Sequence, residues 1–257
     1  MHQSEIVPLS CIIYKYPKEI VYFHVSGEIM RIGEKISNSI EFTNEALFGK
    51  WVRWIMLVIA SIVMPIMYGY TVRIMRGVQP AYEEESFFSL FIDGVKLLVI
   101  YLIYMIIPLI AFAITIGVTS FNVIQTGGNF TMDSLLPIAG ALIAGGLITI
   151  IIGFIFMLLN IIGSVRFART QSMKEAFAFG EIFSTIGKIG WLNYIFSLIV
   201  LFIVVFLIVI VVTIVEVILG FIPILGWILG WGISLFLSPY LSIMVSRYYS
   251  LLYDEGI

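Results

Sequence analysis

The sequence predicts an all-α membrane protein with about five transmembrane helices, two or three amphipathic interfacial helices and a parallel two-span repeat. Hydrophobic residues make up 61% of the 257 residues, charged residues make up 12%, and the mean hydropathy is +1.09. Soluble domains carry roughly 45–50% apolar and about 25% charged residues. The apolar residues also fall in runs of about twenty, which a helix needs to cross a bilayer core of about 30 Å.

Residues 1–29 differ from the rest of the chain. They hold both histidines, His2 and His24, and the single cysteine, Cys11. They lack the basic start and the apolar stretch of a signal peptide. We expect either a variable leader or an upstream extension of a protein that natively starts at Met30. Residues 30–257 are then a single multi-pass domain.

An amphipathic helix precedes the first apolar run. Ile32, Ile36 and Ile40 recur every four residues with polar residues between them, as a helix with one apolar face requires. Thr43 and Asn44 predict the start of a further helix, because such residues cap helix N-termini.

The first span is expected over residues 51–71, which have aromatic residues at both ends, as at two membrane interfaces. Pro65 lies inside this run. The alternative is a re-entrant hairpin that bends at Pro65 and keeps both of its ends on one side. Irregular backbone at that depth must be buried in protein. Both topologies stay open, with five spans as the working arrangement.

Two more segments have the pattern of helices that lie in the membrane interface, with an apolar face opposite a charged one. The first places Phe87, Phe91, Val95 and Leu98 on one face and Glu85, Ser89, Asp93 and Lys96 on the other. The second places Ala176, Phe179, Phe183 and Ile186 on one face and Lys174, Glu181, Thr185 and Lys188 on the other.

The remaining spans are expected over residues 97–117, 135–165, 191–215 and 224–245. The second of these runs is about ten residues longer than a perpendicular span needs, which predicts tilt or a break at Gly145-Gly146. Gly220 and Pro223 predict a tight turn between the last two spans. Small residues four apart, Ala141 with Gly145 and Gly226 with Gly230, indicate close helix contact.

The pattern V-R-x-x-R, amphipathic helix, span occurs twice. Arg73 and Arg76 belong to the first copy, and Arg166 and Arg169 to the second. Copies of two spans each run parallel, as in transporters whose repeats are related by an axis along the membrane normal. Proteins without any duplication also place arginines at helix ends between spans, so both origins stay open.

The basic residues indicate an orientation. With five spans, one side carries Arg73, Arg76, Lys96, Arg166, Arg169, Lys174, Lys188 and Arg247, and the connections after the second and fourth spans carry no basic residue. The positive-inside rule then places the arginine-bearing loops and the C-terminus in the cytosol of a cell membrane. Lys35, Lys50 and Arg53 are exceptions to this rule.

Few residues are candidates for chemistry. Arg73, Arg76, Arg166 and Arg169 are suited to lipid phosphates, an anionic substrate or an acidic partner, because guanidinium groups pair with such oxygens. They are equally suited to anchoring helix ends, and that interpretation is preferred. No motif for a nucleophile, a metal site or a nucleotide occurs, so we expect neither enzyme activity nor a cofactor.

Three polar features within or beside the spans have ordinary explanations. Glu216 lies near the outer end of its span, where an interfacial position is expected, although buried membrane carboxylates can mark ion paths. Asn160 lies deeper and suits a hydrogen bond between helices. Residues 129–131 form an N-glycosylation pattern in the loop expected outside, which is a weak signal.

Six separated stretches resemble a family of mainly archaeal multi-pass membrane proteins, catalogued as domain of unknown function 4013. They are EALFGKWVRW, GYTVRIMRG, SFFSLFIDGVKLLVIYLIY, RFARTQSMKEAFAFGEIF, IGWLNYIFSLIV and LSPYLSIMVSRYYSLLYDE. The resemblance implies a helical membrane fold, an archaeal cell membrane and a domain that begins near Met30. It implies no catalytic residue, cofactor or substrate.

Two functions from different classes follow from these observations. A non-catalytic scaffold or accessory subunit agrees with the shortage of polar residues in the spans. The alternative, a permease or channel-like protein, agrees with parallel repeats and requires that the faces bearing Thr149, Gly153, Asn160 and Glu216 converge on one cavity. The expected partners are the lipid bilayer and either another protein or further copies of the chain, and not nucleic acid.

Overall fold

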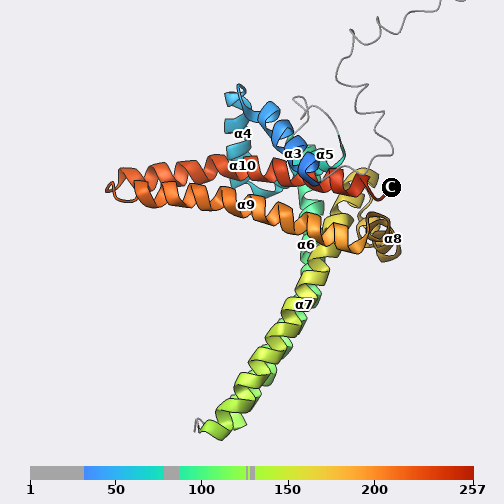
Figure 1. Ribbon diagram of the computed structural model, residues 1–257, viewed down its shortest axis with the longest axis vertical. Coiled ribbons are helices and arrows are strands. Elements are labelled where there is room, and N and C mark those ends of the chain that lie inside the picture. The colour runs from blue at the N-terminus through green and yellow to red at the C-terminus, as the bar shows by residue number, and fades with distance from the viewer. Residues whose placement is uncertain (1–31, 78–86, 126, 128–130) are drawn as a thin grey trace, which may run out of the picture. The chain divides into compact units, whose positions relative to one another are not determined.

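Two helical hairpins carry most of the apolar sequence (Figure 1). α6 (Phe87–Gln125) packs along α7 (Met132–Thr170), and α9 (Trp191–Leu219) packs along α10 (Leu225–Asp254). The computed structural model describes residues 32–77, 87–125, 127 and 131–257. Within these ranges every regular element is a helix, so the predicted all-α class is confirmed.

All four hairpin helices are long and apolar enough to cross a membrane. The shortest of them, α9, has 29 residues, and at about 1.5 Å per residue it exceeds a bilayer core of about 30 Å. These helices correspond to the second to fifth predicted spans. α7 runs through Gly145 and Gly146 without interruption, so the predicted break there is absent.

The first predicted span is divided into α4 (Trp51–Ile62) and α5 (Met64–Met75). Each has 12 residues and is therefore about 18 Å long, too short to cross a bilayer alone. Val63 leaves the helical conformation between them, with φ −94° and ψ 78°. Pro65 lies in the first turn of α5, where its missing N–H interrupts no hydrogen bond. Among the described residues there are thus four helices of spanning length, not five.

A single helix, α3 (Ile32–Leu47), precedes this pair, so the fresh start predicted at Thr43 and Asn44 is wrong. Ser39 and Thr43 donate their hydroxyls to the carbonyl oxygens of Lys35 and Ser39, both at 2.7 Å. The side chains are satisfied inside the helix instead of capping a new one. Together with Lys35 they form the buried face of α3.

The segment 87–98 is the start of α6 and not a separate interfacial helix. Its predicted polar face is the packed one, because Asp93 is 8% exposed while Phe87 is 64% exposed. In a soluble helix the apolar face would pack inward, whereas a membrane protein turns ionisable groups toward its own interior.

Two glycines allow α5 and α6 to touch backbone to backbone. A Cβ atom added to Gly94 would lie 1.6 Å from the Pro65 carbonyl oxygen, and one added to Gly69 would lie 1.8 Å from the Leu90 carbonyl oxygen. Any larger residue at either position would therefore force the two helices apart.

The second predicted interfacial segment is interrupted at Ala178, which separates the 3-10 helix η1 (Met173–Phe177) from α8 (Phe179–Ile189). Ile186 is buried as part of the predicted apolar face, but Thr185 from the predicted polar face is buried as well. Phe179 and Phe183 are 42% and 46% exposed, and the ring of Phe179 also makes an edge contact with the buried Tyr104. The predicted division of residues between faces is therefore wrong at Thr185.

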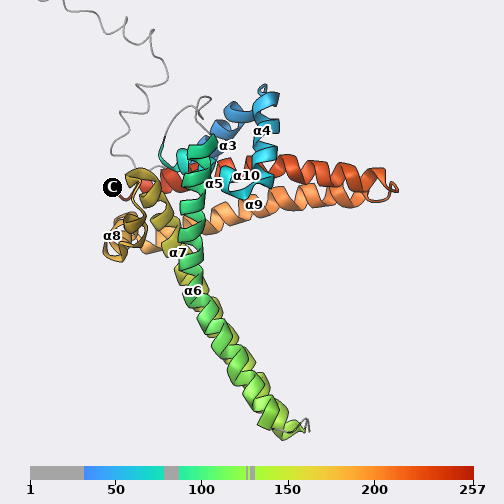
Figure 2. The ribbon, with the colours of Figure 1, turned by 180° about the vertical axis from the view of Figure 1, so that it is seen from behind.

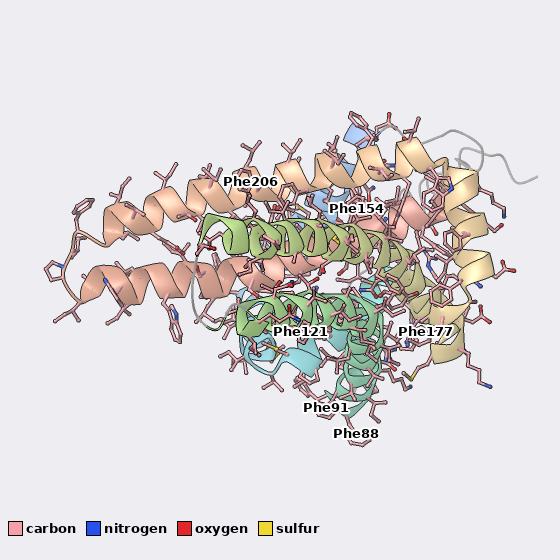
Figure 3. All side chains as sticks on the ribbon, turned by 90° about the horizontal axis from the view of Figure 1, so that it is seen from below. Phe88, Phe91, Phe121, Phe154, Phe177 and Phe206 are labelled. Carbon is pink, nitrogen blue, oxygen red and sulfur yellow. The ribbon has the colours of Figure 1, made fainter. Side chains whose placement is uncertain are left out.

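The hydrophobic core lies at one end of each hairpin (Figure 2). We call this region the base: the ends of α5, α7 and α10 and the starts of α6 and α9, together with α3, η1 and α8. Ile100, Ile162, Tyr194 and Tyr248 are among its buried side chains. Away from the base the hairpins expose large apolar side chains, as expected of helices in lipid; Figure 3 labels Phe121, Phe154 and Phe206 among them.

Candidate functional site

The four predicted site arginines gather in the base at the ends of two helices. Arg73 and Arg76 lie at the C-terminal end of α5, and Arg166 and Arg169 lie at the C-terminal end of α7. The V-R-x-x-R spacing places both members of a pair on one helix face, one turn apart. Positive charge also suits a helix C-terminus, where the macrodipole is negative.

Arg73 and Arg76, the first arginine pair, both bind Asp93 of α6. Arg76 Nη2 donates to Asp93 Oδ2 at 2.8 Å, and Arg73 Nη2 lies 3.2 Å from the same oxygen. Lys96 Nζ approaches Oδ1 at 3.5 Å. Three cations thus surround one buried carboxylate, which compensates the cost of removing its charge from water.

The second pair draws its carboxylates from two other elements. Arg166 pairs with Glu175 in η1. Arg169 Nη2 donates to both oxygens of Asp254 at the end of α10, at 2.7 and 2.9 Å. Asp93 stands three residues before Lys96 in the first copy, but Thr185 stands three residues before Lys188 in the second. The second copy lacks a carboxylate at this position, and its arginines pair with Glu175 of η1 and Asp254 of α10.

The two arginine pairs contact each other in a reciprocal way. Arg76 Nε donates to the carbonyl oxygen of Ala168 at 3.0 Å. Arg169 Nη2 donates to Ser250 Oγ at 2.9 Å, and that hydroxyl donates in turn to the carbonyl oxygen of Met75 at 3.4 Å. Ala168 and Met75 both directly precede the second arginine of their copies. This correspondence supports the repeat interpretation, which stays a prediction.

A buried lysine joins α3 to the last turn of α10. Lys35 is fully buried, and its Nζ donates to both carboxylate oxygens of Glu255 at 2.8 Å. Ser197 Oγ of α9 lies 3.5 Å from the same nitrogen. Nearby, Arg247 Nε donates to Asn38 Oδ1 at 3.1 Å. From the sequence, Lys35 and Asn38 are polar residues between the apolar positions of α3, yet Lys35 is buried, and Ile36 and Ile40 pack against the core as well.

The polar residues of the spans lie in separate places. Thr149 of α7 is 3.4 Å from Thr115 of α6. Ser164 donates to Asn160 at 3.1 Å within α7. Ser234 of α10 donates to Glu216 of α9. These contacts belong to different hairpins, and a Cβ atom added to Gly153 would meet no atom within 4 Å.

Close contact at the predicted small residues is confirmed. A Cβ atom added to Gly145 would lie 2.5 Å from a side-chain carbon of Thr115, and one added to Gly226 would lie 1.8 Å from the Leu219 carbonyl oxygen. These glycines serve packing within each hairpin. The predicted glycosylation pattern at 129–131 falls largely outside the described residues.

Residues 54–217 match a family described as "Protein of unknown function (DUF4013)". The chain belongs to this family. The match runs from α4 into the end of α9 and includes both arginine pairs, Asp93 and Glu175. It is narrower than the expected range from Met30 onward, and the last of the six resembling stretches lies beyond it. No curated protein and no solved structure matches the chain.

The family's description assigns no activity, so the site must be judged on its own chemistry. Among the described residues no three of the types His, Cys, Asp and Glu lie close enough together to hold a metal ion. What the base contains is a set of ion pairs that connect helices far apart in the chain.

Sequence reasoning found the arginines of the base but missed the groups that face them from α3 and α10. Lys35, Asp254 and Glu255 received no role, although Asp254 and Glu255 form an acidic pair at the end of the long helix α10. That pair was the available signal, because a carboxylate near a cytosolic membrane edge lies within reach of the many arginines expected there.

Proposed function

We propose that this protein is a non-catalytic membrane scaffold or accessory subunit, embedded in the cell membrane with the base on the cytosolic side. The main support for this proposal is that the polar side chains of the spans do not line one common route through the membrane. Thr149 faces α6, whereas Glu216 faces α10. A transport path needs polar groups that converge on one cavity, and the separation of these two contacts supports the scaffold proposal over the permease alternative.

The ion pairs of the base favour a holding role as well. Each of the four arginines has a carboxylate within 3.2 Å. These ion pairs connect α5 to α6, and α7 to η1 and α10. Contact of these arginines with lipid phosphates or an acidic partner remains part of the proposal, as an addition to this anchoring role.

The exposed side of α8 suits the cytosolic surface of a bilayer. The rings of Phe183 and Trp191 are in tilted contact, with centroids 5.8 Å apart, and both are exposed. Lys174 and Lys188 are exposed close to them in sequence. Aromatic rings beside lysines are typical of helices that rest in the headgroup layer. We propose this surface as the lipid-facing support of the base.

The test is gentle purification from the native membrane, followed by the mass of the intact complex and flux assays in liposomes. We expect a stoichiometric partner and no flux of ions or small solutes above that of empty liposomes. The matched control carries Thr149→Val and Glu216→Gln, which should leave the liposome result unchanged. A homo-oligomer with flux that this double variant abolishes would overturn the scaffold proposal in favour of a permease.

A further inference from the structure

The hydrogen bonds and the ion pair that α3 and α4 make with α10 show how far along α10 these two helices reach. Lys35 meets Glu255, Asn38 meets Arg247, and Asn44 Oδ1 accepts from the Tyr240 hydroxyl at 3.1 Å. Trp54 at the start of α4 donates its indole N–H to the carbonyl oxygen of Phe236 at 3.1 Å. As the chain proceeds from residue 35 to residue 54, its partners in α10 thus move from the base toward the middle of that helix.

The chain then returns to the base along α5. Tyr70 and Ile74 are buried in one cluster with Ile243, and Met75 accepts a hydrogen bond from Ser250. Arg76 at the end of α5 reaches Ala168 in the base. The beginning of α3 and the end of α5 therefore lie at the same end of α10. Phe236 marks the deepest of these contacts, and it is 11 residues short of Leu225, the first residue of α10.

We infer that α4 and α5 form a re-entrant pair, which enters the membrane from the arginine-bearing side and returns to that side without crossing. The 11 residues between Leu225 and Phe236 amount to about 16 Å of helix, roughly half of the bilayer core. The hydrogen bonds of α3, α4 and α5 with Arg247, Tyr240, Phe236 and Ser250 of α10 all lie on the base side of this outer part.

This topology removes the exceptions to the positive-inside rule. With five spans, Lys35, Lys50 and Arg53 would lie on the opposite side from the other basic residues. With four spans and a re-entrant pair, no lysine or arginine of the described residues has to be placed on the side opposite the base. The inference needs only that the chain is embedded in a membrane, and it does not depend on whether the protein acts as a scaffold.

In this re-entrant topology, one face of α4 lies against lipid. Val52, Ile55, Met56 and Ile59 follow the i, i+3, i+4, i+7 pattern and are 49–69% exposed. Trp54 and Leu57 on the other face pack toward α10 and α5. The occupant is therefore the acyl chains of the leaflet on the base side.

Cysteine labelling decides the topology. In a chain with Cys11→Ser, single cysteines are introduced as Gly33→Cys in α3, Phe221→Cys in the α9–α10 turn and Ile257→Cys at the C-terminal end. All three positions are exposed. Intact cells are treated with a membrane-impermeant maleimide, before and after permeabilisation. We expect Gly33→Cys and Ile257→Cys to react only after permeabilisation and Phe221→Cys to react before it.

Labelling of Gly33→Cys together with Phe221→Cys would overturn the inference, because residues 51–75 would then cross the membrane. If Phe221→Cys and Ile257→Cys react alike, α10 does not cross, and the four-span arrangement fails with the inference. Neither result bears on partner binding or flux, so the scaffold proposal is tested separately.

Spin labels test the lipid-facing surface. Ile59→Cys is exposed and Leu57→Cys is its buried control two residues away. In liposomes we expect oxygen to relax a label at residue 59 several-fold more than a water-soluble nickel complex does. A label at residue 57 should be protected from both. Protection of residue 59 from both reagents would show that protein covers this face and would overturn the assignment to lipid.

Discussion

Arg76 donates its Nε–H to the carbonyl oxygen of Ala168 while its Nη2 donates to Asp93, so that one guanidinium joins α5, α6 and α7. Ala168 lies 92 residues away in the chain. A planar guanidinium can direct two hydrogen bonds toward different partners, which an ammonium on a flexible stem does far less well. The chemistry of arginine, beyond its charge, is therefore what this contact requires.

Arg76→Lys should lower stability even though the charge is kept. We expect the loss of the hydrogen bond to Ala168 to cost about 1–3 kcal/mol, because that buried carbonyl oxygen is left without its donor. Thermal unfolding in detergent measures the change. Lys96→Arg is the control, since Lys96 is partly exposed and 3.5 Å from Asp93. Equal midpoints for Arg76→Lys and the native protein would contradict this account of the base.

Lys35 and Glu255 should be strongly coupled. Glu255→Gln leaves a buried ammonium without its carboxylate, and breaking such a pair costs about 3–5 kcal/mol. Lys35→Met together with Glu255→Leu should recover most of that loss, because no buried charge remains. Arg169→Ala with Asp254→Ala is the comparison: this pair is partly exposed, and its coupling should be about 0.5–1 kcal/mol. Additive effects at Lys35 and Glu255 would argue against the contact.

Gly94→Ala should separate α5 from α6. The added methyl group would lie 1.6 Å from the Pro65 carbonyl oxygen, a backbone atom that cannot move without moving the helix. We expect most of the protein to be lost as aggregate on size-exclusion chromatography. Gly153→Ala adds the same methyl group to α7 with no atom within 4 Å, and it should elute as the native protein does. Normal elution of both variants would mean that α5 and α6 do not touch.

Tyr104→Phe should weaken the attachment of η1. The Tyr104 hydroxyl donates to the carbonyl oxygen of Ala176 at 2.6 Å, and both residues are buried. Removing one hydroxyl and leaving the carbonyl oxygen unpaired should cost about 1–3 kcal/mol. Limited proteolysis near residues 171–178 should become faster, while cleavage elsewhere stays unchanged. Phe183→Leu on the exposed face of α8 serves as the control and should alter neither rate.

The long spans could be predicted from sequence because they depend on composition over twenty residues. α9 and α10 begin within one residue of their predicted starts, at Trp191 and Leu225. The burial of amphipathic faces could not be predicted in the same way. Asp93 and Lys35 looked like solvent-facing residues, since in water the polar face is the outer one. Lipid reverses that rule, and the pattern alone does not say which solvent a face meets.

Of the candidate site, the arginines could be predicted from the sequence, but their carboxylate partners could not. The arginines of α5 and α7 stand out because they end apolar runs. Their carboxylates lie 9 to 85 residues away from them in the chain, and Lys35 is 220 residues from Glu255. No local pattern encodes such distances. The break at Val63 lies two residues before Pro65, where the sequence predicted a bend as one of two alternatives, but apolar neighbours on both sides could not decide between a bend and a continuous span.

The pairing of Lys35 with Glu255 also sets an order of events during synthesis. A ribosome has made α3 and all four long helices before it adds the carboxylate that Lys35 requires. The Lys35 ammonium must therefore stay in water or among headgroups until Glu255 emerges. A polypeptide stopped just short of Glu255 would insert its helices and keep the contacts of Asn38 and Asn44 with α10, yet leave Lys35 without its carboxylate.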